Sequence, residues 1–250
     1  MSFLKDSFKS LNAFLPELIT LRRILHANPE LSGQEYKTRR LIVDQLTNYG
    51  WRIKQSQECM GVIAELGPID GPLIGLRVDM DALPIKELTG LDHASQIEGV
   101  MHACGHDIHT CIGLGIAKLF TTELTPLTGI RLIFQPAEEI AKGAKWMRDE
   151  GATQNLNVLF GVHVAPELPV GSIGLRSGTL TAGAGELEIE IIGIGGHGAR
   201  PHESVDSIWI TAKVITTLQE AISRCLDSLN PVVISFGKIQ GGNAFNVIPD

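Results

Sequence analysis

The sequence has few cysteines, no long apolar run and no excess of positive charge, and each shortage excludes a class of protein. Four cysteines are too few and too scattered for a disulfide framework in 250 residues, so we expect free thiols and a cytoplasmic location. No apolar run reaches the length of a membrane span, and the first residues lack the pattern of a signal peptide. The formal net charge of -7 provides no broad cationic surface for a nucleic acid. We therefore expect neither a membrane nor a nucleic acid as a partner.

What is present is the composition and patterning of a globular chain, with 44% hydrophobic and 20% charged residues. Apolar residues recur at helical spacing from Leu11 to Leu25, and residues 34–49, 108–120 and 144–149 are also predicted to be helical. The expected strands are residues 61–66, 73–78, 130–134 and 158–164. Strands that alternate with helices indicate βαβ units, and therefore an α/β domain around a mostly parallel, buried sheet.

The pattern changes near Gly183, and a second, smaller α+β unit is predicted from there. The expected elements are a strand at 186–192, a helix at 204–229 and a strand at 232–236. The glycine-rich stretch 171–185 is the expected junction, which gives domains at 1–180 and 181–250. Because the sequence stops directly after a Gly-Gly turn, we expect this unit to be incomplete. It should expose an unpaired strand edge and apolar surface through which the chain associates.

Residues 101–110, MHACGHDIHT, hold the densest group of chemically active side chains. Cys104 and His106 stand two apart in a glycine-containing segment that leads into a helix, where strand-end loops gather function. Alone, such a pair would be a buried structural cysteine beside a hydrogen-bonded histidine. Three further polar residues accompany it: His102, Asp107 and His109. This density favours a transition-metal site.

Two pairs of carboxylates follow predicted strands. Glu138 and Glu139 come just after the strand at 130–134, so one can bind a metal while the other acts as a general base. The alternative is an acidic first turn of a helix. Asp79 and Asp81 come at the end of the strand expected at 73–78, where a carboxylate can either orient a metal ligand or cap a turn.

Two single histidines are weaker candidates. His163 lies at the end of the strand at 158–164, where a histidine is more often a core residue than a ligand. It gains weight because it ends a strand at the same expected sheet edge as the other candidates. His197 stands among glycines in the second unit, and spacing alone does not separate a ligand-binding residue from a plain turn histidine.

Seven stretches together resemble a known family, the aminoacylase and carboxypeptidase-type metallopeptidases. The stretches are LRRILHANPELSGQE at 21–35, LRVDMDALPIKE at 76–87, MHACGHDIHT at 101–110, FQPAEE at 134–139, GVHV at 161–164, GGHGARPHESVD at 195–206 and GGNAFNVIP at 241–249. The chain is most similar to the N-acyl-amino-acid amidohydrolase branch, which includes hippurate hydrolases, acetyl-diaminopimelate deacetylases and auxin-conjugate hydrolases. The resemblance runs in order through nearly the whole sequence.

This resemblance implies a metallopeptidase catalytic domain with an inserted lid, and a site for two divalent ions. Its implied ligands are Cys104, which bridges the ions, His106, Glu139 and His163. The other implied roles are Glu138 as general base, Asp81 as the residue that orients the metal site, His197 as oxyanion stabiliser, and Asn243 and Asn246 as contacts for the substrate carboxylate. Zinc or manganese is expected, with cobalt or nickel as alternatives. A homodimer formed through the lid is also implied.

The expected reaction is hydrolysis of the amide bond of a small N-acyl-amino acid. Two departures from the family pattern bear on it. Asp79 stands where distant members place a metal-binding histidine, and similar proteins continue well beyond position 250 and supply one further histidine ligand. The chain is therefore expected to be a fragment, or a shortened protein that holds its second metal weakly. Two alternatives remain: a non-catalytic metal-binding or dimerisation remnant, and a thiol nucleophile formed by Cys104 with His106.

Overall fold

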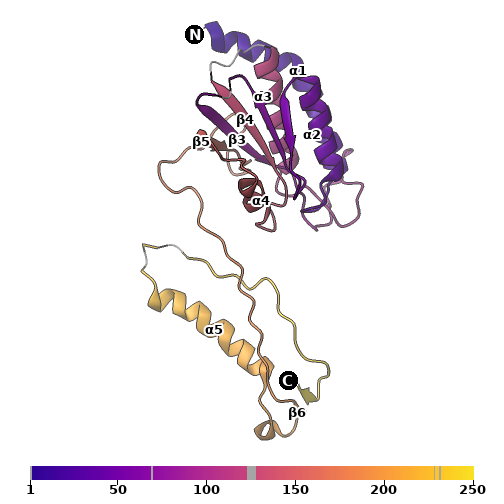
Figure 1. The fold of residues 1–250 in the computed structure, drawn as a ribbon. Helices are drawn as coiled ribbons and strands as arrows, with labels where there is room; N and C mark the ends of the chain where they lie inside the picture. The colour runs from indigo at the N-terminus through magenta and orange to yellow at the C-terminus, as the bar shows by residue number, and fades with distance from the viewer. Residues whose placement is uncertain (1, 69, 123–127, 228, 231) are drawn as a thin grey trace. The chain divides into compact units, whose positions relative to one another are not determined.

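The computed structural model describes residues 2–68, 70–122, 128–227, 229–230 and 232–250. The chain divides into two compact units, residues 1–174 and 175–250 (Figure 1). The two domains expected at 1–180 and 181–250 stay a prediction. Within the described residues, no helix combines the length and apolar character that crossing a bilayer requires.

The first unit is built on a five-stranded sheet. Its strands are β1 (Arg52–Gln55), β2 (Val62–Leu66), β3 (Leu73–Asp79), β4 (Gly129–Gln135) and β5 (Leu156–Gly161), in the order β1-β2-β4-β3-β5. β3 pairs in parallel with β4 and β5, whereas β2 is antiparallel to both β1 and β4, so β2 alone runs against the other strands. The α/β class with a mostly parallel sheet is confirmed. Strand β1 was not expected, because its sequence Arg-Ile-Lys-Gln contains no apolar run.

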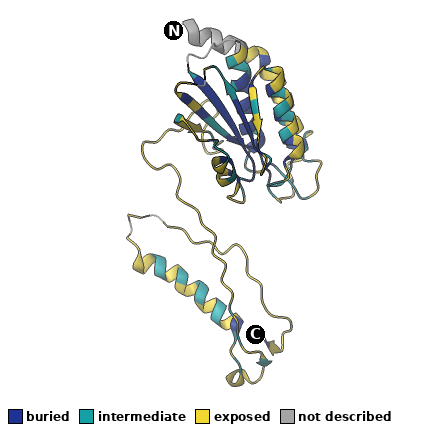
Figure 2. Ribbon diagram, viewed as in Figure 1, coloured by how far each residue is buried: buried dark blue, intermediate teal, exposed yellow. Residues whose placement is uncertain are grey.

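Helices cover both faces of this sheet. The helices are α1 (Ser2–Ala27), α2 (Tyr36–Asn48), α3 (His106–Thr122) and α4 (Gly143–Asp149). One face packs against α1, α2 and α3 through a core that includes Leu25, Leu46 and Leu114, while Met147 of α4 packs against the opposite face (Figure 1). Because both faces are covered, every residue of β4 is buried (Figure 2). Each fully buried aliphatic or aromatic side chain in such a core stabilises the fold by about 1.5–3 kcal/mol.

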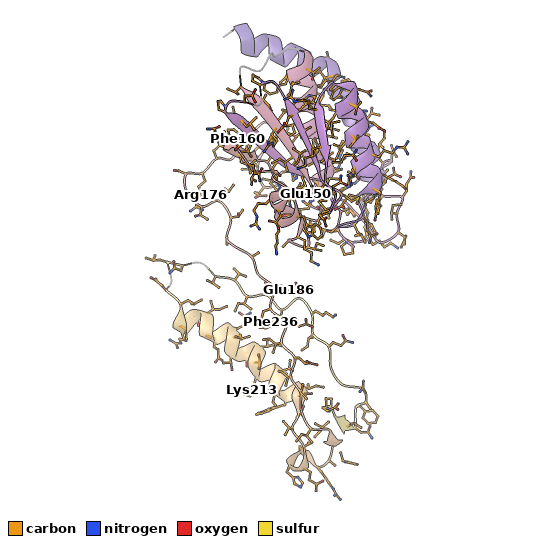
Figure 3. The ribbon with its side chains drawn as sticks, in the orientation of Figure 1. Glu150, Phe160, Arg176, Glu186, Lys213 and Phe236 are labelled. Carbon is orange, nitrogen blue, oxygen red and sulfur yellow. The ribbon has the colours of Figure 1, made fainter. Side chains whose placement is uncertain are left out.

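The parallel strands bring several loops to one edge of the sheet. β3, β4 and β5 end at the same edge, and Asp79 stands directly beside Gln135 in the register. The segments that follow these strands carry Asp81, the Glu138–Glu139 pair and His163. Strand β5 ends at Gly161, not at 164 as expected, so His163 lies on the connecting segment beyond the strand. β5 is also an edge strand, and its Phe160 is 56% exposed (Figure 3).

The second unit contains α5 (Ser207–Cys225), the short 3-10 helix η1 (Pro201–Glu203) and a two-stranded antiparallel sheet of β6 (Gly196–His197) and β7 (Val247–Ile248). Asp206 caps α5 by accepting a hydrogen bond of 2.9 Å from the Trp209 N–H. The predicted helix at 204–229 is therefore shorter than expected, and its position 228 lies outside the described residues.

The strands predicted at 186–192 and 232–236 are wrong. Both segments are described, and neither has a strand partner in the described part of the chain. An alternating pattern specifies which side chains share a face, but a strand also needs a neighbour to complete its hydrogen-bond ladder.

Candidate metal centre

The first unit brings the four expected metal ligands together. Cys104 Sγ lies 3.3 Å from His163 Nε2, and His106 Nε2 lies 3.8 Å from Glu139 Oε1. Candidate ligand atoms of Cys104, His106 and His163 lie within 4.8 Å of one another, as do those of His106, Glu138 and Glu139. Because His106 belongs to both groups, the two form one continuous cluster.

Two buried atoms in this cluster have no hydrogen-bond partner among the described residues: His106 Nε2 and Glu139 Oε1. A buried polar atom left without a partner costs about 1–3 kcal/mol. The two atoms face each other across 3.8 Å, and one cation at about 2 Å from each would satisfy both. Sulfur, nitrogen and carboxylate donors together suit a borderline transition metal such as zinc. The residues present therefore fit a divalent metal.

Asp81 connects two of the candidate ligands. Its buried carboxylate accepts hydrogen bonds from His106 Nδ1 at 3.2 Å, from the Ser32 hydroxyl at 2.6 Å and from the Glu139 N–H at 3.0 Å. Burial raises the pKa of Asp81, but the hydrogen bonds from His106 and Ser32 outweigh burial and the net pKa is lowered. A charged Asp81 keeps the proton of His106 on Nδ1, which leaves the Nε2 lone pair available for a metal.

The cluster concentrates negative charge. Burial, followed by the charges of Glu139 and Glu138, raises the pKa of the Cys104 thiol to about 12. Burial also raises the pKa of Glu139, and the opposing interaction with the neighbouring His106 does not fully offset it. A cation bound among these groups would relieve this repulsion.

The thiol-nucleophile alternative finds little support in this geometry. That hypothesis pairs Cys104 with His106. In the structure, Cys104 Sγ hydrogen-bonds to His163 Nε2 instead. A thiol with so high a pKa is protonated near neutrality and is a weak nucleophile until a metal binds it.

Glu138 and Glu139 lie in a turn between β4 and α4, so they are not the first turn of a helix. Ala137 and Ala141, on either side, have φ values of 50° and 53°, in the left-handed region that disfavours alanine. The Glu138 side chain is 38% exposed and that of Glu139 is 18% exposed. Glu139 is thus the less accessible of the two and lies beside the buried His106, while Glu138 remains accessible to a water molecule.

Several residues that hold this site were not singled out by the sequence. Glu35 is wholly buried and accepts a hydrogen bond of 2.8 Å from the Ala137 N–H, directly before the acidic pair. Ser32 binds Asp81, as described above. His109 lies beside His106 but uses both of its ring nitrogens on other protein groups. The sequence had named His109 only as one of the polar residues near Cys104 and His106, without a role; its spacing of three residues from His106 places both on one face of α3.

The candidates in the second unit lie in a different setting. His197 is exposed in β6, and its Nδ1 accepts a hydrogen bond of 3.1 Å from the Ala199 N–H. The Gly198 N–H donates to the Asn246 carbonyl at 2.9 Å, and His197 pairs with Val247, so Asn246 lies directly before the strand that pairs with His197. Asn243 is exposed. The roles expected for these three residues stay predictions.

Comparison with known proteins gives consistent matches. Residues 75–249 match the sequence profile of peptidase family M20/M25/M40. A probable hydrolase of Synechocystis sp. is 52% identical over 239 residues, which cover 94% of this chain and 61% of that protein. An N-acetylcysteine deacetylase of Bacillus subtilis is 45% identical, covering 95% and 63% of the two chains.

A solved structure of a protein from the same family also matches this chain. The Bacillus subtilis YXEP protein, described as a dinuclear metal-binding peptidase from the M20 family, superposes with a TM-score of 0.71 at 38% identity, covering 96% of this chain and 62% of that one. The chain therefore spans about three fifths of the length of the relatives it matches.

Proposed function

Because this chain belongs to peptidase family M20/M25/M40, as its sequence motifs predicted, we propose that it forms the metal-binding part of an amidohydrolase that acts on N-acyl-amino acids. The observation that carries the proposal is the pair of unpartnered buried atoms, His106 Nε2 and Glu139 Oε1, beside the accessible Glu138. The similarity to a deacetylase of an N-acetylated amino acid supports this substrate class.

The proposed roles in binding follow the geometry. Cys104, His106, Glu139 and His163 would hold two divalent ions. Zinc or manganese fits these donors, and cobalt or nickel is an alternative. When bound, such ions supply Lewis acidity and bring the pKa of water towards about 7.

The chain's own residues would then handle the proton. Glu138 accepts a proton from the attacking water and passes it to the departing amine, a role that its exposed carboxylate and its position 4.0 Å from His106 Nε2 support. Asp81 keeps His106 in the tautomer with a free Nε2. His197 is assigned the stabilisation of the oxyanion, and Asn243 and Asn246 the binding of the substrate carboxylate. A cytoplasmic homodimer formed through the second unit completes the proposal.

Substitution of Glu138 tests the proposal directly. Glu138→Gln should keep the metal content measured by elemental analysis, while release of amine from hippurate or N-acetyl-amino acids falls by about 10²–10⁴-fold. Glu220→Gln makes the same change of charge on the exposed surface of α5 and should leave both quantities unchanged. Near-normal turnover by Glu138→Gln would exclude Glu138 as the base. Two bound metals without turnover in the unsubstituted protein would exclude the amidohydrolase.

A further inference from the structure

His109 lies between two candidate ligands without being available as a ligand itself. The residue is wholly buried, and its ring centroid lies 4.7 Å from that of His163 and 5.4 Å from that of His106. Its Nδ1–H donates to Asp79 Oδ1 at 2.5 Å, and its Nε2 accepts a hydrogen bond of 2.9 Å from the Val164 N–H. With both nitrogens occupied by protein groups, no lone pair is left for a metal.

These two bonds belong to a longer chain of contacts, which we call the strand-end network. It consists of Gln135, Arg77, Asp79, His109 and Val164. Arg77 Nε donates to Gln135 Oε1 at 2.8 Å, and Arg77 Nη1 donates to Asp79 Oδ2 at 2.6 Å. The network thus runs from the end of β4 through the end of β3 and the first turn of α3 to the segment beyond β5. Each of these places also carries a candidate metal-site residue.

The network ends at Val164, whose carbonyl accepts a hydrogen bond from the neighbouring His163. His163 Nδ1 donates to the Val164 carbonyl at 2.8 Å, which leaves Nε2 directed to Cys104 Sγ at 3.3 Å. Val164 also packs against Gly105, where a Cβ atom would lie only 2.6 Å from Val164 Cγ2. Val164 is therefore fixed both by its N–H and by its side chain.

His163 needs such a support because little else restrains it. The side chain is exposed, and it follows the exposed edge strand β5. Burial, which restrains His106, is absent at His163. Its contacts among the described residues are the Val164 carbonyl, Cys104 Sγ and the edges of two histidine rings. A ligand held largely by its neighbour's backbone depends on whatever holds that neighbour.

We propose that His109 is a positioning residue for the metal centre: it binds the Val164 N–H and thereby directs the imidazole of His163 towards Cys104. Asp79 holds the other ring nitrogen of His109 in place, and it acts through His109 instead of binding the metal. The inference rests on the proposed function only in taking His163 as a ligand. The expected result of losing the contact is weaker cation binding with the fold retained.

Three substitutions of His109 separate its two hydrogen bonds in the full chain. His109→Phe keeps the ring and removes both bonds. His109→Asn keeps a donor near the Nδ1 position but loses the acceptor for Val164. His109→Gln places an amide oxygen near the Nε2 position and so retains an acceptor for Val164.

Two measurements read the effect. Titration with Co²⁺, followed by the thiolate-to-cobalt and d–d absorption bands, gives the metal Kd, and amide hydrogen exchange without metal gives the protection of the Val164 N–H. His109→Phe and His109→Asn should raise the Kd by about 10–100-fold and abolish the protection, as losses of outer contacts do. His109→Gln should stay within about threefold of the unsubstituted chain.

Thr110→Val is the matched control. Thr110 is equally buried on the same helix and donates to the Asp79 carbonyl at 3.0 Å, but it does not reach Val164. Its substitution should leave the Kd within about threefold and the Val164 amide protected. Unchanged Kd, spectrum and protection in His109→Phe and His109→Asn would overturn the proposal. If His109→Phe does not fold, the Asn and Gln pair decides. An unsubstituted chain without a thiolate–cobalt band would overturn the proposed function, and Val164 protection would still decide the role of His109.

Discussion

The two units of this chain hold their candidate functional residues in opposite ways. In the first unit, the buried Asp81 hydrogen-bonds directly to His106 and to the Glu139 N–H, and the buried His109 binds the backbone N–H beside His163. In the second unit, His197 and Asn246 are exposed and are related mainly by backbone pairing of β6 with β7. The difference shows where geometry is set in advance. The first unit holds its candidate ligands through buried side-chain contacts, whereas His197 and Asn246 lie on the exposed surface of the second unit.

The largest effect is expected from a cysteine substitution that should distinguish the two units. Cys104→Ser removes a candidate ligand, so the Kd for Co²⁺ should rise by more than about 100-fold, because even outer contacts change affinity by 10–100-fold. Cys225→Ser makes the same change at an exposed position of α5 and should leave the Kd unchanged. Absorption titration gives both values, and equal Kd values for the two variants would break the comparison.

Two glycines with the same φ angle give the next largest effect. Gly105 and Gly178 both have φ of +84°, but a Cβ at 105 would meet Val164, whereas nothing lies within 4 Å of a Cβ at 178. Gly105→Ala should therefore lower the free energy of unfolding by about 2–4 kcal/mol, from backbone strain and overpacking together. Gly178→Ala should lower it by at most about 1 kcal/mol, because only the backbone term applies. Denaturant unfolding measures both, and similar losses would show that Val164 is not tightly seated.

A buried carboxyl makes the stability of the first unit depend on pH. Burial raises the pKa of Glu35 above its ordinary value of 4.5, so the folded chain binds this proton more tightly than the unfolded chain does. The resulting stabilisation is complete below pH 4.5 and is lost as pH rises through the raised pKa. Glu35→Gln carries no such proton, so its stability relative to the unsubstituted chain should increase as pH rises.

The measurement is the free energy of unfolding of both proteins between about pH 4 and pH 8. Glu186→Gln, at an exposed position of the second unit, serves as the control (Figure 3). Its free energy of unfolding should differ from that of the unsubstituted chain by no more than about 0.5 kcal/mol, as for other surface substitutions. A constant difference between Glu35→Gln and the unsubstituted chain over this range would contradict the prediction.

The smallest effect on the metal centre is expected from the second unit's histidine. His197→Ala removes an exposed side chain that, among the described residues, accepts one hydrogen bond, from the Ala199 N–H. The free energy of unfolding should change by less than about 0.5 kcal/mol, and the Kd for Co²⁺ should stay the same. A tenfold weaker Kd would mean that His197 takes part in metal binding, which would remove the contrast between the units.

Periodicity and turn residues were sufficient for most of the first unit. The apolar runs at 130–134 and 73–78 became β4 and β3. Every residue of β4 is buried, which makes its apolar signal continuous, whereas β3 is only partly buried and its Ile74 is exposed. Strand β1 has a single apolar residue, and it is recruited by pairing with β2 rather than by its own pattern. In the second unit the alternation at 186–192 was a sound local signal without the neighbouring strand that would make it effective.

The candidate ligands were also predictable, since residue types and spacing mark Cys104, His106 and Glu139 as possible donors. Of their supports, Asp81 was expected, but Glu35 and the contacts of His109 were not. Glu35 acts through a hydrogen bond to Ala137, which is 102 positions away in the sequence, and His109 acts through a backbone N–H 55 positions away. Such contacts depend on which strands lie side by side, and no local pattern encodes that order.

The two left-handed alanines that flank the acidic pair bear on how this protein would fail on warming. Alanine does not favour that conformation by itself, so the bend persists only while its surroundings compel it. A local opening of the packing around this turn would let both alanines leave the left-handed region. The Glu138 and Glu139 carboxylates would then lose their orientation before the sheet unfolds. Heat inactivation should then precede melting, and the interval between the two temperatures would measure how firmly the bend is braced.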